Sequence, residues 1–354
     1  MPIIESSATR RLWFAIAFLL TLSGKCASQT VPAGYQVATW RGFRSAAISY
    51  TFDDNCPNQL AIAVPMFDRF GFKVTLFTVT SPKWVWPANW SGLQKAALGG
   101  DEIASHTIDH PKFDTLSDSA LQAELSRSRD TINAHIKGKR CITIAYPYCF
   151  PGNEAMDAEY YIAARGCSGQ IVSKTPSDFM NISSFVCGDQ GLNTVTAIDA
   201  EADSAAARNG WCVYLMHGIN GTEPGAYSPI SQDTILATLE YLSAHPDEFW
   251  VAPFGTVARY IKERNSASVS EVSAHGDSIT FRMTDNLDGS YYDVPLTVRR
   301  ELPEGWDSAI VYQNDGPLSS DIVKIDRVRY VTFDALPDTG NVTIVRKTGN
   351  GFDR

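Results

Sequence analysis

Two adjacent carboxylates follow a short strand-like run near the start of the chain. Residues 46–52 are rich in apolar and strand-favouring side chains, which predicts a buried strand, and Asp53 and Asp54 come directly after them. Burying two carboxylates together is costly unless a cation lies beside them. Because successive side chains of extended backbone point in opposite directions, one carboxylate could bind a metal while the other transfers protons. A solvated aspartate-rich turn is the alternative for this pair taken alone.

Three further apolar runs also end in polar side chains that are capable of catalysis. These side chains are His106 and His110, the sequence Tyr146-Pro147-Tyr148, and His217. In a barrel of parallel strands, the C-terminal ends of the strands form the edge at which catalytic residues gather. The sequence therefore predicts one site to which four strand ends contribute.

The histidines suggest a metal ion. His106 and His110 are four residues apart, so a compact loop or helical turn could direct both at one point. Together with Asp54 they form an Asp-His-His set, which is the three-ligand open pattern of catalytic zinc. The same ligands would also accept other first-row divalent ions. A structural histidine pair is the alternative when the spacing is considered alone.

The four polar segments carry a family resemblance. Residues 51–54, 106–110, 146–148 and 215–217 resemble motifs one, two, three and five of the NodB-type polysaccharide deacetylases (carbohydrate esterase family 4), in that family's order and at its separations. The resemblance extends from about residue 46 to residue 264. It implies a distorted β/α barrel of about seven strands that removes acetyl groups from a glycan with a metal ion.

The resemblance also assigns roles to single residues. It makes Asp53 the general base, His217 the general acid and the backbone N–H of Tyr148 an oxyanion donor. Pro147 belongs to the same third motif and is a candidate substrate-binding residue. Leu215 lies two residues before His217, so it would form the pocket for the acetyl methyl group; ordinary core packing is the alternative for this side chain.

The chain departs from the family pattern at three points. Ala145 stands where the third motif usually opens with an arginine, Asn55 replaces the glycine after the aspartates, and the fourth motif has no clear match. Asn tolerates the left-handed backbone that a glycine would adopt there. We hypothesise that Arg165, at the end of the strand predicted for residues 160–165, supplies the missing cation by pairing with Asp53. A surface-paired arginine is the alternative.

The remaining pattern divides the chain into regions. Strand and helix patterns alternate from residue 46 to residue 264, which predicts a β/α barrel domain over residues 29–265. Alternating runs with intervening turn signals predict an all-β, sandwich-like domain over residues 266–354, which serves either structural support or glycan binding.

Three tryptophans lie in a loop of the first domain. Trp84, Trp86 and Trp90 stand among prolines and a glycine, between a predicted strand and a predicted helix. Such side chains either offer flat faces to sugar rings or close the end of a barrel. We treat Trp84 and Trp86 as candidate substrate-binding residues.

The N-terminus has the outline of a secretory signal. Arg10 and Arg11 precede an apolar run over residues 12–22, and small residues follow at Ala27 and Ser28, which predicts a signal peptide over residues 1–28. This run is shorter than the roughly twenty residues that span a bilayer. We therefore expect a secreted protein, extracellular or periplasmic, without membrane insertion after the signal is removed.

Charge and cysteine content limit the partners. The formal net charge of −9 disfavours nucleic acid as a partner and leaves a neutral glycan unaffected, and we expect a monomer. Removing Cys26 with the signal leaves six of the seven cysteines, an even number that predicts disulfides in an exported protein. We expect Cys56 and Cys149 to pair, because each follows a site motif closely.

Together these features predict a secreted, metal-dependent deacetylase of N- or O-acetyl groups on a polysaccharide or oligosaccharide. Zinc is the expected metal. An N-acetylglucosamine polymer is preferred slightly to O-acetylated xylan as the substrate. The alternative is a catalytically silent glycan-binding protein on the same fold, which the replacement by Ala145 and the missing fourth motif would explain.

Overall fold

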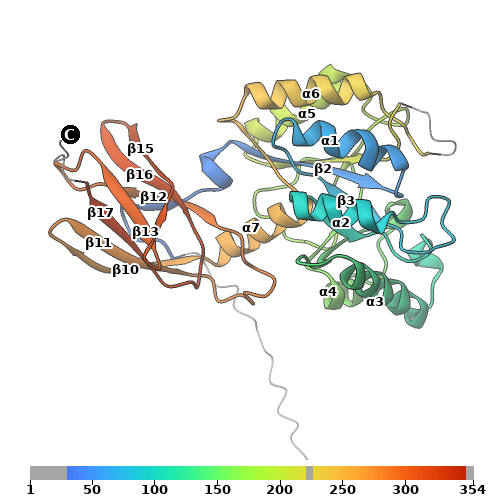
Figure 1. Cartoon of the computed structure of the whole chain (residues 1–354), viewed down its shortest axis with the longest axis horizontal. Coiled ribbons are helices and arrows are strands. Elements are labelled where there is room, and N and C mark those ends of the chain that lie inside the picture. The colour runs from blue at the N-terminus through green and yellow to red at the C-terminus, as the bar shows by residue number, and fades with distance from the viewer. Residues whose placement is uncertain (1–29, 221–225, 348–354) are drawn as a thin grey trace, which may run out of the picture.

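The fold has two parts, an α/β barrel and a smaller all-β sandwich (Figure 1). A computed structural model describes residues 30–220 and 226–347. The predicted signal peptide therefore lies outside the described residues. The helix α7 (Phe254–Ser266) ends the barrel part and leads into the sandwich. This architecture confirms the predicted fold class.

The barrel is a sheet of parallel strands. Seven of them follow the order β6-β5-β4-β3-β2-β8-β7, and β9 lies beside the first half of β2. The strands are β2 (Ala46–Asp53), β3 (Thr75–Thr78), β4 (Glu102–Ser105), β5 (Thr143–Ala145), β6 (Ala163–Arg165), β7 (Phe185–Val186), β8 (Trp211–Met216) and β9 (Phe249–Val251).

A short irregular segment connects the two edges of this sheet. The backbone N–H of Ala164 donates to the carbonyl of Phe179, and the N–H of Gly166 donates to the carbonyl of Ile182, both at 2.8 Å. The same segment continues as β7 and pairs with β8. The barrel is therefore closed, but distorted, between β6 and β8.

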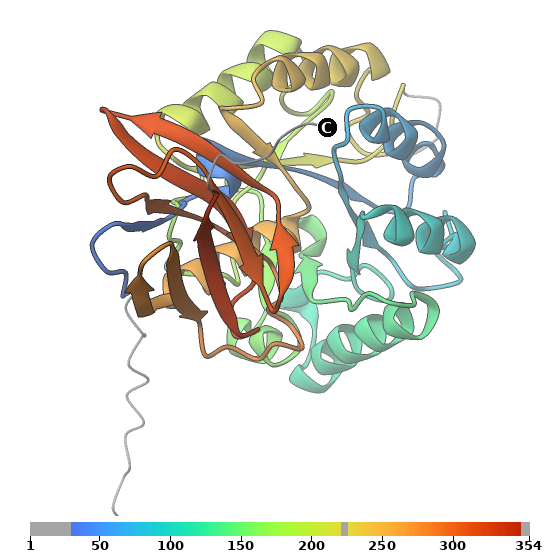
Figure 2. The same ribbon diagram turned by 60° about the vertical axis from the view of Figure 1, so that its left-hand side comes forward.

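Helices surround the barrel, as Figure 2 shows for the view that looks towards one of its ends. The N-cap side chains Asn89, Ser117, Asn153, Thr194 and Ser231 accept hydrogen bonds from the first turns of α2 to α6, which satisfies backbone groups that the helix itself leaves unpaired. The helices are α1 (Val64–Asp68), α2 (Trp90–Gly99), α3 (Asp118–His135), α4 (Glu154–Tyr160), α5 (Val195–Ala207) and α6 (Gln232–Ala244).

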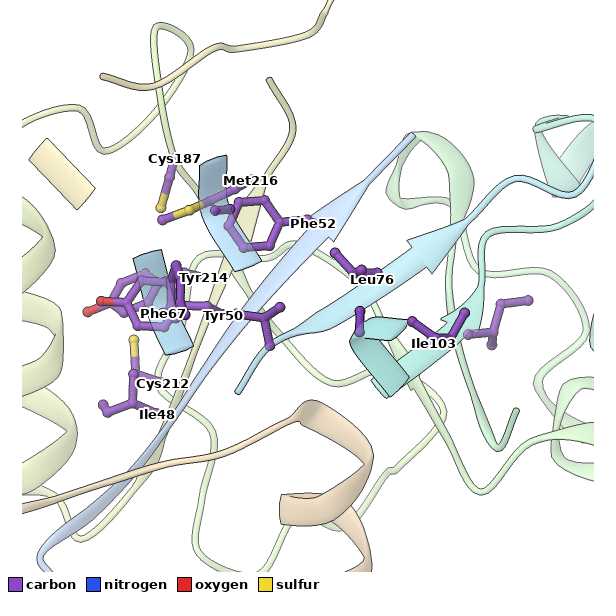
Figure 3. Packing of buried hydrophobic residues seen from close by; sticks show 14 of the residues in the cluster. Ile48, Tyr50, Phe52, Phe67, Leu76, Ile103, Cys187, Cys212, Tyr214 and Met216 are labelled. Carbon is purple, nitrogen blue, oxygen red and sulfur yellow. The ribbon is translucent and has the colours of Figure 1, made fainter. Parts of the chain in front are cut away.

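Strand alternation decides which side chains face the helices. On β2, Tyr50 points outward and its ring centroid lies 4.9 Å from those of both Phe67 and Tyr214 (Figure 3). The preceding residue, Ser49, points inward, and its hydroxyl accepts a hydrogen bond from the Trp211 indole at 3.0 Å. Because this alternation has a period of two, Asp53 ends the inward row.

The helix α7 closes the barrel at the N-terminal ends of the strands. Glu102, the first residue of β4, accepts hydrogen bonds from the backbone N–H of Gly255 at 2.7 Å and from the hydroxyls of Thr75 and Thr143 at 2.8 and 2.6 Å. A carboxylate is favourable beside a helix N-terminus. The strand ends that carry the predicted catalytic residues therefore lie at the opposite end of the barrel.

The sandwich consists of two antiparallel sheets, β1-β12-β16-β15 and β10-β11-β17-β13-β14. Its strands are β1 (Tyr35–Val37), β10 (Ser268–His275), β11 (Ser278–Thr284), β12 (Leu296–Glu301), β13 (Ala309–Gln313), β14 (Gly316–Leu318), β15 (Ser320–Ile325), β16 (Val328–Ala335) and β17 (Asn341–Arg346).

The sandwich packs on α7 through a shared core. One hydrophobic cluster joins barrel residues such as Trp211 and Phe254 to sandwich residues such as Leu296. The Glu263 carboxylate of α7 also accepts the backbone N–H of Val294 at 3.0 and 3.1 Å. The sandwich therefore lies at the barrel end that is away from the predicted site.

Some local elements differ from the sequence pattern. Residues 35–37, which lie within the predicted barrel domain, form β1 and pair with β12 of the sandwich. Tyr160 ends helix α4 rather than beginning a strand. One alternating run of the predicted all-β domain, residues 322–333, is divided between β15 and β16 by a two-residue turn at positions 326–327, where both residues have positive φ. In the described ranges, no helix is long and apolar enough to cross a membrane.

Candidate active site

Three strand ends bring five titratable side chains together. Asp53 is the last residue of β2 and Asp54 follows it, His106 and His110 follow β4, and His217 follows β8. The Nε2 atom of His106 lies 3.7 Å from Asp53 Oδ2 and 3.6 Å from Asp54 Oδ1, while His217 Nε2 lies 4.0 and 3.8 Å from Oδ2 of the two aspartates. The predicted convergence is therefore present in the fold.

Asp54, His106 and His110 form a set that fits a metal ion. One potential ligand atom from each lies within 4.8 Å of the others. Asp54 Oδ1 is 3.6 Å from Nε2 of His106 and 3.5 Å from Nε2 of His110. A tetrahedral ion with bonds of ~2.1 Å separates its ligand atoms by ~3.4 Å. Asp54 Oδ1 is also buried without a hydrogen-bond partner in the described part of the chain, so a cation would satisfy it.

The two histidines are prepared to act as neutral ligands. His106 Nδ1 lies 2.9 Å from the carbonyl oxygen of Ala145, which requires an Nδ1–H donor and leaves Nε2 for a metal. The His110 ring packs between the rings of Trp84 and Tyr148, at centroid distances of 5.0 and 4.6 Å. Burial lowers the pKa of His106 to about 4 and that of His110 to about 3. Both are therefore uncharged at neutral pH.

The backbone around the site is unusually rich in left-handed conformations. Asp54, Asn55, Thr107, His110 and Tyr148 all have φ between 55° and 74°. Side chains other than glycine disfavour this region, so it persists only where the surroundings hold it. Asn55 takes the left-handed conformation that the sequence suggested for it.

Hydrogen bonds from side chains hold these loops in place. The Asn55 amide donates to the carbonyls of Val79 and Trp86, at 2.8 and 3.1 Å. The Glu124 carboxylate of α3 accepts the backbone N–H groups of Ile108 and Asp109, at 2.7 and 3.2 Å. The loop that carries the two histidines is thus fixed to a helix.

Gln59 is a site residue that sequence reasoning missed. Its buried amide donates to the carbonyl oxygen of Asp53 at 2.5 Å and to that of His217 at 3.2 Å. It therefore ties together the ends of β2 and β8. A glutamine at the start of a helical segment carries no chemical signature, and only the packing of the two strand ends shows its role.

Arg165 forms a buried ion pair with Asp53. One guanidinium nitrogen lies 2.8 Å from Asp53 Oδ2, and Arg165 is 1% exposed, which excludes the surface-arginine alternative. Arg165 is paired in register with Ala145 on the neighbouring strand, so it stands beside the position where the family arginine is absent. The small Ala145 side chain adds little bulk between β5 and the guanidinium.

The two aspartates have opposite acidities. Burial opposes ionisation of Asp53, but the nearby Arg165 guanidinium outweighs it and holds the pKa of Asp53 below its usual range. Burial and the neighbouring negative charge of Asp53 raise the pKa of Asp54 to about 7. Asp53 is therefore a stable carboxylate, whereas ionisation of Asp54 would be favoured by a cation beside it.

The other predicted site residues surround this centre. Leu215 is 2% exposed and pairs with Val186 of β7, and it lies on the strand face of His217. Pro147 and Tyr148 form the turn after β5, with Pro147 buried and the Tyr148 ring 55% exposed.

The tryptophans have different surroundings. The Trp84 indole donates to the Asp54 carbonyl at 3.0 Å, so this side chain supports the turn that carries Asp54. Trp86 lines a mainly apolar cavity of about 310 Å³ together with Asn55 and Leu93.

The predicted disulfide is wrong. Cys149 is bonded to Cys167, with their Cα atoms 5.6 Å apart, and not to Cys56. The physical reason is strand order: Cys149 follows β5 and Cys167 follows β6, which are neighbours, whereas β3 and β4 separate β5 from β2 and the following Cys56. Cys56 lies buried in the wall of the Trp86 cavity.

Comparison with known proteins agrees with the site. Residues 41–161 match the family described as polysaccharide deacetylase. This part of the chain therefore belongs to the polysaccharide deacetylase family. Its members are carbohydrate esterases, a class of hydrolases that use a metal. Arg165, Cys167 and His217 lie beyond the residues that match the family.

Two curated proteins are similar to this chain in sequence. Over 330 residues it is 32% identical to a gellan lyase from a Bacillus species, a match that covers 88% of this chain and 13% of that protein. Over 102 residues it is 29% identical to a probable peptidoglycan-N-acetylglucosamine deacetylase from Arthroderma benhamiae, covering 28% of this chain and 23% of that protein. The chain therefore spans less than a quarter of either relative.

Solved structures are also similar to this chain. An allantoinase matches with a TM-score of 0.50 at 11% identity, covering 63% of this chain and 92% of that chain. A putative polysaccharide deacetylase from Mycobacterium smegmatis matches with a TM-score of 0.47 at 15% identity, covering 66% and 95% of the two chains. At these identities, the allantoinase likeness concerns the fold alone.

Proposed function

We propose that this protein is a metal-dependent deacetylase that hydrolyses N- or O-acetyl groups on a glycan. The observation that carries the proposal is the meeting of an Asp-His-His set with a second aspartate and a third histidine at one barrel end. The ligand set leaves coordination positions open, as catalytic metal sites do. Zinc is the metal that we propose.

Asp54, His106 and His110 would hold the ion. When bound, a divalent metal polarises a carbonyl oxygen and lowers the pKa of a nearby water. Asp53 Oδ2 lies beside this set and is kept ionised by Arg165, which suits it to accept a proton from the attacking water.

His217 is placed to return the proton. Its ring nitrogen faces both aspartates from a different strand, so it can reach the other side of a substrate that lies across the site. Protonation of the departing amine or alkoxide is the step that we assign to it. The backbone N–H of Tyr148 would stabilise the developing oxyanion, and the buried Leu215 would contact the acetyl methyl group.

The substrate proposal rests on the family and on the names of the relatives. We prefer an N-acetylglucosamine polymer, as the name of the Arthroderma benhamiae protein suggests. Gellan belongs in the same panel because the relative named gellan lyase is similar over 88% of this chain. O-acetylated xylan is the third candidate.

We also propose that the protein acts outside the reducing cytoplasm as a monomer. The Cys149–Cys167 disulfide supports export, because disulfides persist in oxidising compartments.

The experiment that tests the function measures acetate release from this panel, using metal-free protein and protein reloaded with zinc. We expect release only with metal, and loss of release in Asp53→Asn. The companion variant His110→Ala should bind zinc at least about ten-fold more weakly in a calorimetric titration, because it removes one of three ligands. Full zinc binding by the wild type without acetate release from any glycan would instead favour a silent glycan-binding protein.

A further inference from the structure

The turn that follows β5 contains two successive left-handed residues. Tyr148 has φ 55° and Cys149 has φ 64°, and neither is glycine. In this conformation the Cβ atom approaches the following carbonyl oxygen, so residues other than glycine, asparagine and aspartate rarely adopt it. Some other interaction has to hold the turn.

The disulfide lies directly at this turn. Ala145 and Arg165 form the last register pair between β5 and β6. Cys149 lies four residues after Ala145, and Cys167 lies two residues after Arg165. The disulfide therefore joins the segments that follow β5 and β6, just beyond the end of the sheet. Cys149 itself is one of the left-handed residues, and the covalent bond therefore acts on the strained position.

This turn is packed against the proposed catalytic centre. The Tyr148 ring lies 4.6 Å from that of the metal-ligand candidate His110. The carbonyl of Ala145, which begins the turn, accepts the Nδ1–H of His106 at 2.9 Å. The backbone N–H of Tyr146 donates to the Arg165 carbonyl at 3.1 Å. A change in the turn would therefore move the N–H of Tyr148 without removing any titratable group.

We propose that the Cys149–Cys167 disulfide is a positioning element that keeps Tyr148 and Cys149 left-handed and so directs the Tyr148 N–H into the site. The disulfide would hold position 149 in the left-handed conformation, which a glycine at that position could adopt without a steric penalty. The catalytic part of this inference rests on the proposed deacetylase function, while the conformational part does not.

Two double variants separate this role from general stabilisation. Both Cys149→Ser/Cys167→Ser and Cys149→Gly/Cys167→Ser lack the disulfide, but only the second suits a left-handed backbone. Each is assayed for acetate release well below its unfolding temperature, and zinc affinity is measured in parallel. We expect the serine variant to lose about ten-fold or more in kcat, with KM and zinc affinity within about two-fold of the wild type.

The glycine variant is the decisive comparison. We expect it to recover kcat to within about three-fold of the wild type, because glycine adopts the left-handed region without a steric penalty. Wild-type kcat in the serine variant would overturn the proposal. So would a glycine variant that is folded and as impaired as the serine variant.

Crystal structures of the same variants provide a readout that does not depend on activity. We expect residues 148 and 149 to leave the left-handed region in the serine variant and to keep it in the glycine variant. If the wild type released no acetate from any glycan, the proposed function would fail, and these structures would still decide the conformational role. An unchanged turn in the serine variant would refute it.

Discussion

Replacing Arg165 with methionine tests how the site holds a buried carboxylate. Arg165 is the hydrogen-bond donor to Asp53 Oδ2 at 2.8 Å, and Asp53 Oδ1 has no partner within the described residues. Asp53 is 2% exposed, so water does not replace the lost guanidinium. Removing one partner of a buried ion pair costs about 3–5 kcal/mol, and we expect Arg165→Met to lose about 3 kcal/mol of unfolding free energy in metal-free protein.

A double variant that also replaces Asp53 is the control for this experiment. Asp53→Asn/Arg165→Met removes both charges, so it should recover at least about half of that loss, because no uncompensated charge remains buried. The assay is guanidinium chloride unfolding of all four proteins of the cycle, at equal concentration and without metal. An Arg165→Met protein with the wild-type midpoint and slope would refute the reasoning.

Moving the arginine from position 165 to position 145 tests its contribution to acetate release. Ala145 and Arg165 are opposite each other in register, and neighbouring strands lie about 4.8 Å apart. Ala145→Arg/Arg165→Ala should therefore return a guanidinium to Asp53 and restore part of the acetate release that Arg165→Ala loses. A folded exchange variant no more active than Arg165→Ala would show that the cation is required at position 165 itself.

Two further predictions concern residues with no assigned chemistry. Gln59→Ala removes both buried hydrogen bonds between the ends of β2 and β8, and we expect a loss of about 1–3 kcal/mol in unfolding free energy together with a lower kcat. An unchanged kcat would mean that the two strand ends hold their positions without it. Burial raises the pKa of Glu263 from 4.5 to about 8. The folded protein then keeps a proton that the unfolded chain releases above about pH 4.5, so stability falls as pH rises from about 5 to 8. Glu263→Gln should therefore gain about 4 kcal/mol relative to the wild type as pH rises from about 5 to 8 in denaturant unfolding. A pH-independent difference would exclude Glu263 as the cause.

Local sequence patterns account for much of this site. Asp53 is the last residue of β2, and its side chain points inward because side-chain direction alternates along a strand. This direction follows from the local strand pattern alone. The spacing of His106 and His110, with the adjacent Asp54, was sufficient to suggest an Asp-His-His set. The strand Trp211–Met216 likewise follows from a continuous apolar run.

Contacts between distant strands could not be derived in this way. The pairing of Cys149 with Cys167 depends on β5 and β6 being neighbours in the sheet. The placement of Gln59 between two strand ends, and of residues 35–37 in the sandwich, depends on the same closed arrangement.

One physical reason explains why some features follow from the sequence and others only from the tertiary structure. A residue's secondary structure and its inward or outward direction are set mainly by its neighbours in sequence, so composition and periodicity report them. Which side chains meet is set by strand order and by the closure of the barrel, which are properties of the whole chain. For this protein, the sequence therefore determines the types of the candidate catalytic groups, and the tertiary structure determines the interactions that hold them in position.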